Sequence, residues 1–193
     1  MLQKLSRFAV AAVLCGVTVS AQQIAPREIT FIPDPAASSV SFSLDATLHT
    51  VHGSFALKKS SVRFSPGTNH IDGEIVLDAT SAKTGIEGRD NKMHKDVLES
   101  ARYPEITFLP DRVEGSIAME GTSHVQVHGV FTIHGLAHEM TVPTDVEITP
   151  QHWQATSHFV VPYVQWGMKN PSNFFLHVKD SVQIEVKLAG GKP

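Results

Sequence analysis

Apolar and polar residues alternate strictly along most of this chain. In residues 40–48 the even-numbered positions are apolar and the odd-numbered positions are polar. The same alternation recurs over residues 71–77, 125–133, 140–148 and 182–188. A period of two is typical of a β-strand with one buried and one solvated face. These segments therefore predict a series of half-buried strands.

Turn-forming residues separate the predicted strands at short intervals. We expect turns at residues 65–67, at Asp111, at residues 134–135 and at residues 149–150. Short connections favour an antiparallel meander, and about eight long strands of this kind close into a barrel or fold into a sandwich. The pattern predicts an all-β protein with one domain.

Residues 84–108 interrupt the alternation with a helical period. Met93, Val97, Leu98 and Ala101 would share one face of a helix. Asp90 would cap the start of this helix, and Pro104 would end it before a strand resumes. Such an insert either packs across an open barrel end or forms the rim of a ligand site.

The N-terminal residues have the features of a signal peptide. Lys4 and Arg7 precede an apolar run of about the usual length, which ends in small residues at positions 19–21. We expect cleavage after Ala21 and export to the bacterial periplasm or the medium. The expected division of the chain is a signal peptide at 1–21, a barrel domain at 22–190 and a C-terminal tail at 191–193.

Cysteine usage and charge exclude several classes of function. The only cysteine, Cys15, would leave with the signal peptide, so the mature chain would have no disulfide and no thiol chemistry. Cleavage would remove two of the 16 basic residues and none of the 19 acidic ones, leaving a net charge of about −5. This acidic balance offers no electrostatic footprint for nucleic acid.

Histidines are frequent, with 11 in the chain. His124, His128 and His134 share the outward parity of one predicted strand, and His138 follows the next turn. Their spacing does not bring them together on one strand, so surface imidazoles are favoured over a zinc or copper site. The sequence also lacks a nucleophile elbow, a zinc-protease motif, a phosphate loop and a dinucleotide fingerprint. We expect no catalytic residue, no metal site and no cofactor.

A set of motifs in fixed order resembles the YceI-like family of exported bacterial proteins, over nearly all of the mature chain. The motifs are D-P-A-A-S-S-V-S-F-S (34–43), V-H-G-S-F (51–55), T-G-I-E-G-R-D (84–90), Y-P-E-I-T-F (103–108), V-H-G-V-F-T-I-H-G-L-A-H-E-M-T-V (127–142), W-G-M (166–168) and V-K-D-S-V-Q-I-E-V (178–186). The resemblance implies an extended, lipocalin-like antiparallel β-barrel. In that family the barrel encloses a long apolar cavity for polyisoprenoid lipids such as isoprenoid quinones or prenyl phosphates, and the family is not regarded as catalytic.

The resemblance and the apolar pattern together indicate a candidate ligand site. We expect the apolar cavity to be lined by Phe42, Leu44, Phe55, Phe64, Met93, Leu98, Phe108, Phe131, Trp166, Met168, Phe174 and Phe175. A polar head group would meet Arg89, Lys92 and His94 at the start of the helical insert. For Arg89 the alternative is local pairing with Asp90 or Glu87.

The expected function is storage or transport of an apolar isoprenoid lipid, and both transient membrane contact and a homodimer are compatible with it. Two other functions stay open: a structural or stress-response barrel with a filled core, and a histidine-dependent metal-binding module. Small inward residues at Ala46, Gly73 and Gly129 allow either ligand space or close packing. Contact between Phe55 and Phe131 across the interior would favour the filled core.

Overall fold

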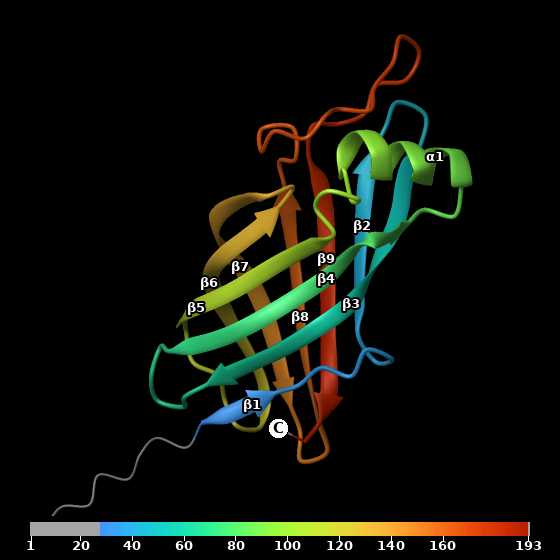
Figure 1. Ribbon diagram of the computed structural model, residues 1–193. Coiled ribbons are helices and arrows are strands. Elements are labelled where there is room, and N and C mark those ends of the chain that lie inside the picture. The colour runs from blue at the N-terminus through green and yellow to red at the C-terminus, as the bar shows by residue number, and fades with distance from the viewer. Residues whose placement is uncertain (1–27, 193) are drawn as a thin grey trace, which may run out of the picture.

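The computed structural model describes residues 28–192, so the expected signal peptide lies outside the described part of the chain. This part folds into nine strands and one short helical insert (Figure 1). In chain order the elements are β1 (Ile29–Phe31), β2 (Ser39–Asp45), β3 (Thr50–Phe64), β4 (Ile71–Lys83), α1 (Glu87–Lys92), η1 (Met93–Val97), β5 (Glu105–Glu114), β6 (Gly121–Ile133), β7 (Leu136–Ile148), β8 (His152–Val161) and β9 (Val182–Gly191).

Eight strands close into an antiparallel barrel. Each strand from β2 to β9 pairs with the next one along the chain, and β9 pairs with β2 to complete the ring. The short β1 lies outside this ring, along the last residues of β3. Closure of the ring removes the unpaired edges that a sandwich would keep. The predicted barrel of about eight strands is confirmed, and the alternative of a sandwich is wrong.

The turn between β6 and β7 shows how the sequence sets the strand register. The two strands pair without interruption from Gly121↔Ile148 to Ile133↔Leu136. His134 and Gly135 connect them, with φ angles of 52° and 74°. Two successive positive φ angles are the geometry of a tight hairpin turn, and glycine adopts it readily. The turn predicted at residues 134–135 is therefore correct.

The expected turn at Asp111 is wrong, because β5 continues through it. The ladder between β5 and β6 is irregular between Pro110 and Arg112, and the chain turns only beyond Gly115, which has a φ of 112°. A proline cannot donate a hydrogen bond to a ladder, and a bulge accommodates it. An adjacent proline and aspartate therefore give the same local signal for a bulge as for a turn.

The first predicted strand also ends earlier than expected. β2 stops at Asp45, and the backbone N–H of Ala46 donates to the carbonyl of His49 at 3.2 Å, which turns the chain. Leu48 lies in this turn and is 80% exposed. The alternation of apolar and polar residues therefore continues for three residues after the observed strand has ended.

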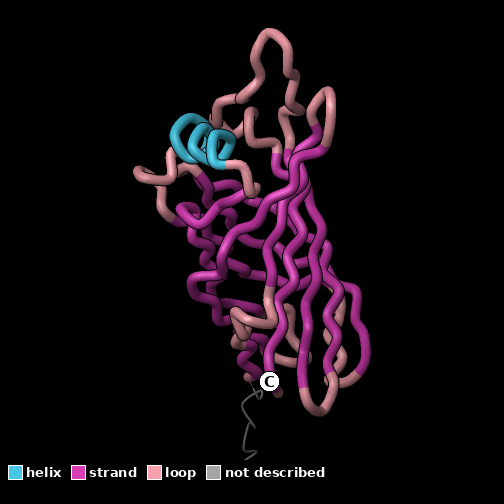
Figure 2. Tube along the Cα trace, turned by 90° about the vertical axis from the view of Figure 1, so that its right-hand side faces the viewer, coloured by secondary structure: helices cyan, strands magenta, loops and turns pink. Residues whose placement is uncertain are grey.

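The helical insert covers one end of the barrel (Figure 2). It begins at Glu87, three residues before the predicted cap, and continues as a wider π-type turn in which Leu98 donates to the carbonyl of Met93 at 2.9 Å. Asp90 does not cap the helix, because its carboxylate accepts from the backbone N–H of Thr84 at 2.8 Å. Ala101 is exposed and does not continue the predicted apolar face.

Two groups of buried side chains fill the two ends of the barrel. One surrounds Phe31 and Trp153 near β1, and the other includes Leu98, Tyr163 and Met168 beneath the helical insert. Partly buried residues such as Phe108 contact both groups, so the interior is continuous. Within residues 28–192, no helix is long and apolar enough to cross a membrane.

Candidate ligand-binding cavity

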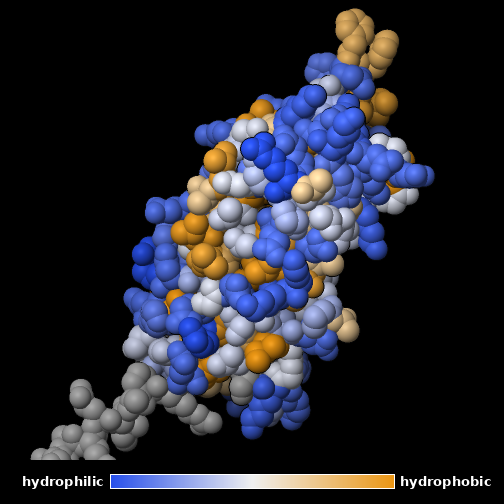
Figure 3. Space-filling model, viewed as in Figure 1, coloured by the Kyte–Doolittle hydropathy of each residue, from blue (hydrophilic) through white to orange (hydrophobic). Residues whose placement is uncertain are grey.

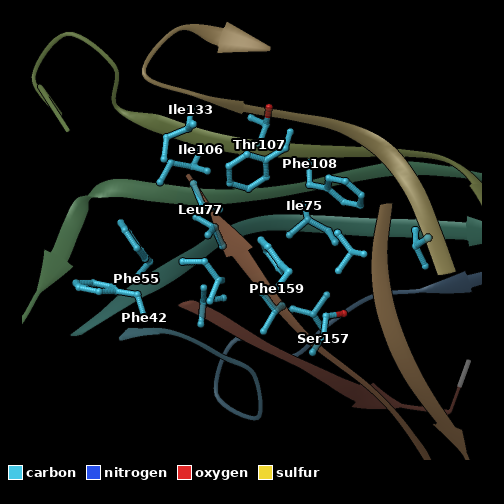
Figure 4. Close-up of a pocket in the computed structure, with 18 of the residues that line it drawn as sticks. Phe42, Phe55, Ile75, Leu77, Ile106, Thr107, Phe108, Ile133, Ser157 and Phe159 are labelled. Atoms are coloured by element: carbon cyan, nitrogen blue, oxygen red, sulfur yellow. The ribbon is translucent and has the colours of Figure 1, made fainter. Parts of the chain in front are cut away.

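The barrel encloses a cavity of about 240 Å³ that extends along its interior. This volume lies just below the range of about 300–1,000 Å³ that is common for drug-sized ligands. The wall is built from inward-facing residues of the strands, because alternate residues of a strand face the same side of a sheet. In Figure 4, side chains from several strands, among them Phe55, Leu77, Phe108 and Phe159, lie around this space.

The wall of the cavity is apolar except for a few hydroxyl groups. Thr144 and Ser157 contribute aliphatic hydroxyls, and no charged side chain from residues 28–192 lines the wall. The Thr144 and Ser157 hydroxyl oxygens lie 2.9 Å apart, and the Thr144 hydroxyl donates to the Val142 carbonyl at 3.3 Å. Because these groups satisfy one another, the cavity can bind a ligand chiefly by removing apolar surface from water.

Different structures cover the two ends of the cavity. At the β1 end, the rings of Phe31 and Trp153 meet edge to face, with centroids 5.0 Å apart. At the other end, Met93, Val97 and Leu98 of the insert meet residues of segment 162–179, of which Met168 and Pro171 also line the wall. The helical insert and segment 162–179 are thus the two covers of this end.

A contact at Lys92 joins the helical insert to segment 162–179. The Lys92 ammonium group donates to the backbone carbonyl of Pro171 at 3.2 Å. Within residues 28–192, this is the one hydrogen bond that links the two covers. A single exposed hydrogen bond contributes little net stability, about 0.5–1.5 kcal/mol. We therefore call this end of the barrel the lid end.

Eight of the predicted cavity residues lie in the cavity wall: Phe42, Leu44, Phe55, Met93, Leu98, Phe108, Phe131 and Met168. Phe55 packs on Phe42 and Phe131 packs on Phe159, so Phe55 and Phe131 each have another aromatic partner on their own side. Among the described residues, Phe55 and Phe131 do not form an aromatic pair with each other. The collapsed interior that this contact would have indicated is not observed.

Four of the predicted cavity residues do not line the cavity. Phe64 is buried beneath β1, at the end of β3. Trp166 lies beside the wall, with its ring stacked 3.9 Å from the ring of His138. Phe174 and Phe175 are 88% and 86% exposed. The apolar character of these residues predicted that they would line the cavity. Composition alone does not show which side of a loop faces the barrel.

Several residues of the wall were missed, although the alternation contained the signal for them. Ile75, Leu77, Val127, Ile133 and Ile184 line the cavity and belong to the apolar parity of their strands. Aromatic size favoured the phenylalanines in the prediction. The parity of the strand is the better guide, since every inward residue of a closed barrel faces the same interior.

The predicted head-group residues have partners within the protein. Arg89 donates to the hydroxyl and carbonyl of Thr84 at 2.7 and 3.1 Å. The Thr84 hydroxyl also donates a hydrogen bond to the Asp90 carboxylate. This bond lowers the pKa of the Asp90 carboxyl below its usual value. The ring nitrogens of His94 lie 2.9 Å from the Ser100 hydroxyl and 2.8 Å from a backbone carbonyl.

These contacts anchor the insert, and none of the three predicted residues lines the cavity. The alternative prediction for Arg89 was local pairing with Asp90 or Glu87. Arg89 does pair locally, but its partner is Thr84 rather than a carboxylate. Lys92 alone is exposed and lies at the lid end. Of the predicted set, it is the residue that a head group outside the cavity would meet most directly.

Comparison with known proteins identifies the family of this chain. A sequence model described as the YceI-like domain matches residues 31–189. The chain belongs to the YceI-like family. No curated protein matches it.

Solved structures with the same fold include three bacterial proteins. BcnA of Burkholderia cenocepacia is 22% identical, with a TM-score of 0.68 over 82% of this chain and 99% of that one. A polyisoprenoid binding domain from Saccharophagus degradans, implicated in plant cell wall breakdown, is 16% identical, with a TM-score of 0.66 over 84% and 98%. The YCEI protein of Campylobacter jejuni is 13% identical, with a TM-score of 0.56 over 98% and 99%. At these identities the likeness shows a shared fold.

Two of the predicted histidines of this YceI-like domain lie apart, each beside a different aspartate. His124 lies 2.5 Å from Asp145, and His128 lies 2.7 Å from Asp111. Within the described residues, no three potential ligands are grouped as a metal site would need. His134 was expected on the surface, but the turn places its ring against Tyr103, with centroids 4.6 Å apart.

Proposed function

We propose that this YceI-like protein binds the tail of a polyisoprenoid lipid in its barrel and stores or transports it after export. The observation that carries the proposal is the apolar cavity, which has no charged side chain in its wall among the described residues. The structural neighbour from Saccharophagus degradans, a polyisoprenoid binding domain, supports the same class of ligand. Burial contributes about 0.8 kcal/mol per methylene, and the cost of association limits the net affinity.

The polarity of the wall favours particular head groups. A phosphate inside the cavity would be a buried charge without a partner, which is strongly unfavourable. A prenyl phosphate would therefore keep its head outside, where Lys92 is exposed at the lid end. A quinone head is neutral, so it can enter an apolar cavity without burying an unpaired charge. We propose an isoprenoid quinone as the ligand.

Binding of this kind needs no covalent chemistry. The cavity wall contains no carboxylate, imidazole or thiol from the described residues, and its hydroxyls have no adjacent base. A hydroxyl needs such a base to act as a nucleophile. We therefore propose a binding protein rather than an enzyme.

The test is the lipid content of protein recovered from its own host compartment. Native mass spectrometry and solvent extraction should find a co-purifying isoprenoid, with quinones recognised by their absorbance and mass. Recovery from the periplasm or medium would also test the proposed export. Repeated absence of any lipid, in preparations that never met detergent, would overturn the proposal.

A further inference from the structure

Two aromatic side chains project from the lid end into solvent. Phe174 and Phe175 are 88% and 86% exposed, the highest values among the large apolar residues described. Their rings contact each other edge to face, with centroids 5.2 Å apart. In Figure 1 the loop that carries them rises above the barrel, and in Figure 3 the apex at that place is apolar. We call Phe174 and Phe175 the aromatic tip.

Hydrogen bonds hold the aromatic tip in this outward position. The side-chain oxygen of Asn173 accepts from the backbone N–H groups of Phe175 and Leu176 at 3.0 and 2.9 Å. The backbone N–H of Asn173 donates to the Leu176 carbonyl at 2.9 Å. Ser172 accepts from the N–H of Val178 at 2.8 Å, which closes the base of the loop. The loop therefore has a defined turn whose apex consists of the two rings.

The adjacent turn between β2 and β3 supports the base of the loop. The backbone N–H of Thr47 donates to the carbonyl of His177 at 2.9 Å, and the N–H of His177 donates to the Thr47 hydroxyl at 3.1 Å. The next residue, Leu48, is also largely exposed. Two hydrogen-bonded turns thus carry exposed apolar side chains at the same end of the barrel.

We infer that the aromatic tip docks on a phospholipid bilayer and inserts its two rings among the lipids. The size of the tip argues against a protein partner: two aromatic side chains bury about 150–250 Å² each. A stable protein interface buries about 800 Å² on each partner. Insertion into a membrane interface does not need such an area, since it depends on apolar side chains at a projecting point.

The loop that carries the tip is not acidic, so it does not repel an anionic lipid surface. Residues 169–180 contain Lys169 and Lys179 and one acidic residue, Asp180, although the chain as a whole has a net charge of −3. Lys179 is balanced by Asp45 at 2.9 Å, whereas Lys169 has no carboxylate partner among the described residues. Lys92 adds a second exposed cation at the lid end. A basic residue near an anionic membrane contributes about tenfold or less to binding.

Docking in this orientation would bring the cavity to the membrane. Pro171 belongs to the same loop as the aromatic tip and lines the cavity, so the lid end would face the lipid. An isoprenoid tail could then pass between bilayer and barrel without crossing water. This step rests on the proposed function, but insertion of the tip does not depend on it.

Site-specific fluorescence tests the insertion. In the exported chain, which has no other cysteine once the expected signal peptide is removed, His177→Cys places an environment-sensitive dye beside the tip. Ser116→Cys places the dye in the turn after β5, at the opposite barrel end. Vesicles of phosphatidylcholine and phosphatidylglycerol in a ratio of about 3:1 supply the anionic surface. The dye at position 177 should shift to the blue and be quenched by brominated acyl chains, and the dye at 116 should show neither effect.

A matched pair of variants tests the rings themselves. Phe174→Ser with Phe175→Ser should lower partition into the vesicles roughly a hundredfold, about tenfold for each ring removed from the lipid. The control is Leu109→Ser with Val160→Ser, which removes two exposed apolar side chains from the outer wall of the barrel. The control variant should bind vesicles as the unaltered chain does.

The outcomes separate this inference from the proposed function. Unchanged partition of the tip variant, together with an unquenched dye at 177, would overturn the inference. The tip variant could instead change the oligomeric state of the protein while the dye at 177 shows no insertion into vesicles. That result would assign the two rings to a protein contact and would also overturn the inference. Uptake of a short-chain ubiquinone, followed without vesicles by quenching of the intrinsic tryptophan fluorescence, reports on the cavity alone. Loss of that uptake with normal insertion would count only against the proposed function.

Discussion

Replacing Ala155 by leucine distinguishes an open cavity from a filled core. Ala155 lies in β8, opposite Val146 of β7 and Leu188 of β9, and all three residues line the cavity. A leucine at this position extends into the space along the barrel axis. Its effect on the free energy of unfolding depends on whether that space is free.

The magnitude follows from the added side chain. Leucine has three more carbon atoms than alanine, and burial is worth about 0.8 kcal/mol for each, so an open cavity predicts stabilisation of up to about 2 kcal/mol. A filled core predicts the opposite sign, since overpacking costs about 1–3 kcal/mol. The new side chain would also occupy part of the cavity of about 240 Å³, so quinone uptake should fall.

Ala79→Leu is the matched control. Ala79 is 2% exposed in the packed group beneath the helical insert and does not line the cavity. The same added volume should therefore destabilise the protein by about 1–3 kcal/mol. Urea unfolding of lipid-free protein, extrapolated linearly to water, measures both variants on one scale.

A specific result would refute this reasoning. If Ala155→Leu destabilises the lipid-free protein as much as Ala79→Leu does, the interior around β8 has no free space. The structural barrel with a filled core would then be the better account of the molecule. If the variant is more stable but takes up as much quinone as before, the ligand does not occupy this part of the cavity.

Three further changes test other parts of the structure. Gly129→Ala would place a methyl group 2.4 Å from the carbonyl oxygen of Leu109, so the free energy of unfolding in urea should fall by about 1–3 kcal/mol, and an unchanged value would contradict the close approach. Lys92→Met removes the hydrogen bond to Pro171, so stopped-flow release of quinone should accelerate while the free energy of unfolding falls by no more than about 0.5–1.5 kcal/mol; an unaltered release rate would exclude this contact as a latch. Burial raises the pKa of Tyr163 to about 12 from 10, so its contribution is complete below pH 10 and is lost as the pH rises towards 12. Urea unfolding between pH 9 and about 11 should show this decline, and Tyr163→Phe should flatten it.

The barrel could be predicted because its determinants are local. The parity of residues 125–133 fixes which side chains face inward, and the tight turn at residues 134–135 fixes the register with the next strand. A closed antiparallel meander has few other solutions for strands of this length. The helical insert was located for the same reason, since its period differs from that of its neighbours.

The lid end was predicted less well because local side-chain hydrogen bonds, which leave no periodic pattern in the sequence, determine it. Phe174 and Phe175 have the composition of buried residues, but a side-chain bond from Asn173 holds the turn that exposes them. Arg89 was expected to face a ligand, yet Thr84, five residues earlier, accepts both of its bonds. No period in the sequence distinguishes a side chain that anchors a loop from one that meets a ligand.

Two glycines lie beneath aromatic rings of the cavity wall. An eight-stranded barrel is narrow enough for its own side chains to fill it. A Cβ atom on Gly53 would lie 2.2 Å from the Phe42 ring, and one on Gly129 would lie 2.8 Å from the Phe108 ring. Both rings line the cavity, and the tip of each ring lies over a glycine of the neighbouring strand.

The glycines therefore do not make space for a ligand directly, because an aromatic ring covers each of them. They let a large apolar ring approach the neighbouring strand closely, because a Cβ atom at either position would collide with the ring. Aromatic rings over glycines are also a known means of pinning strand register, so the same pairs stabilise the barrel. Stability and ligand capacity then depend on the same contacts, and a substitution at either glycine should affect both.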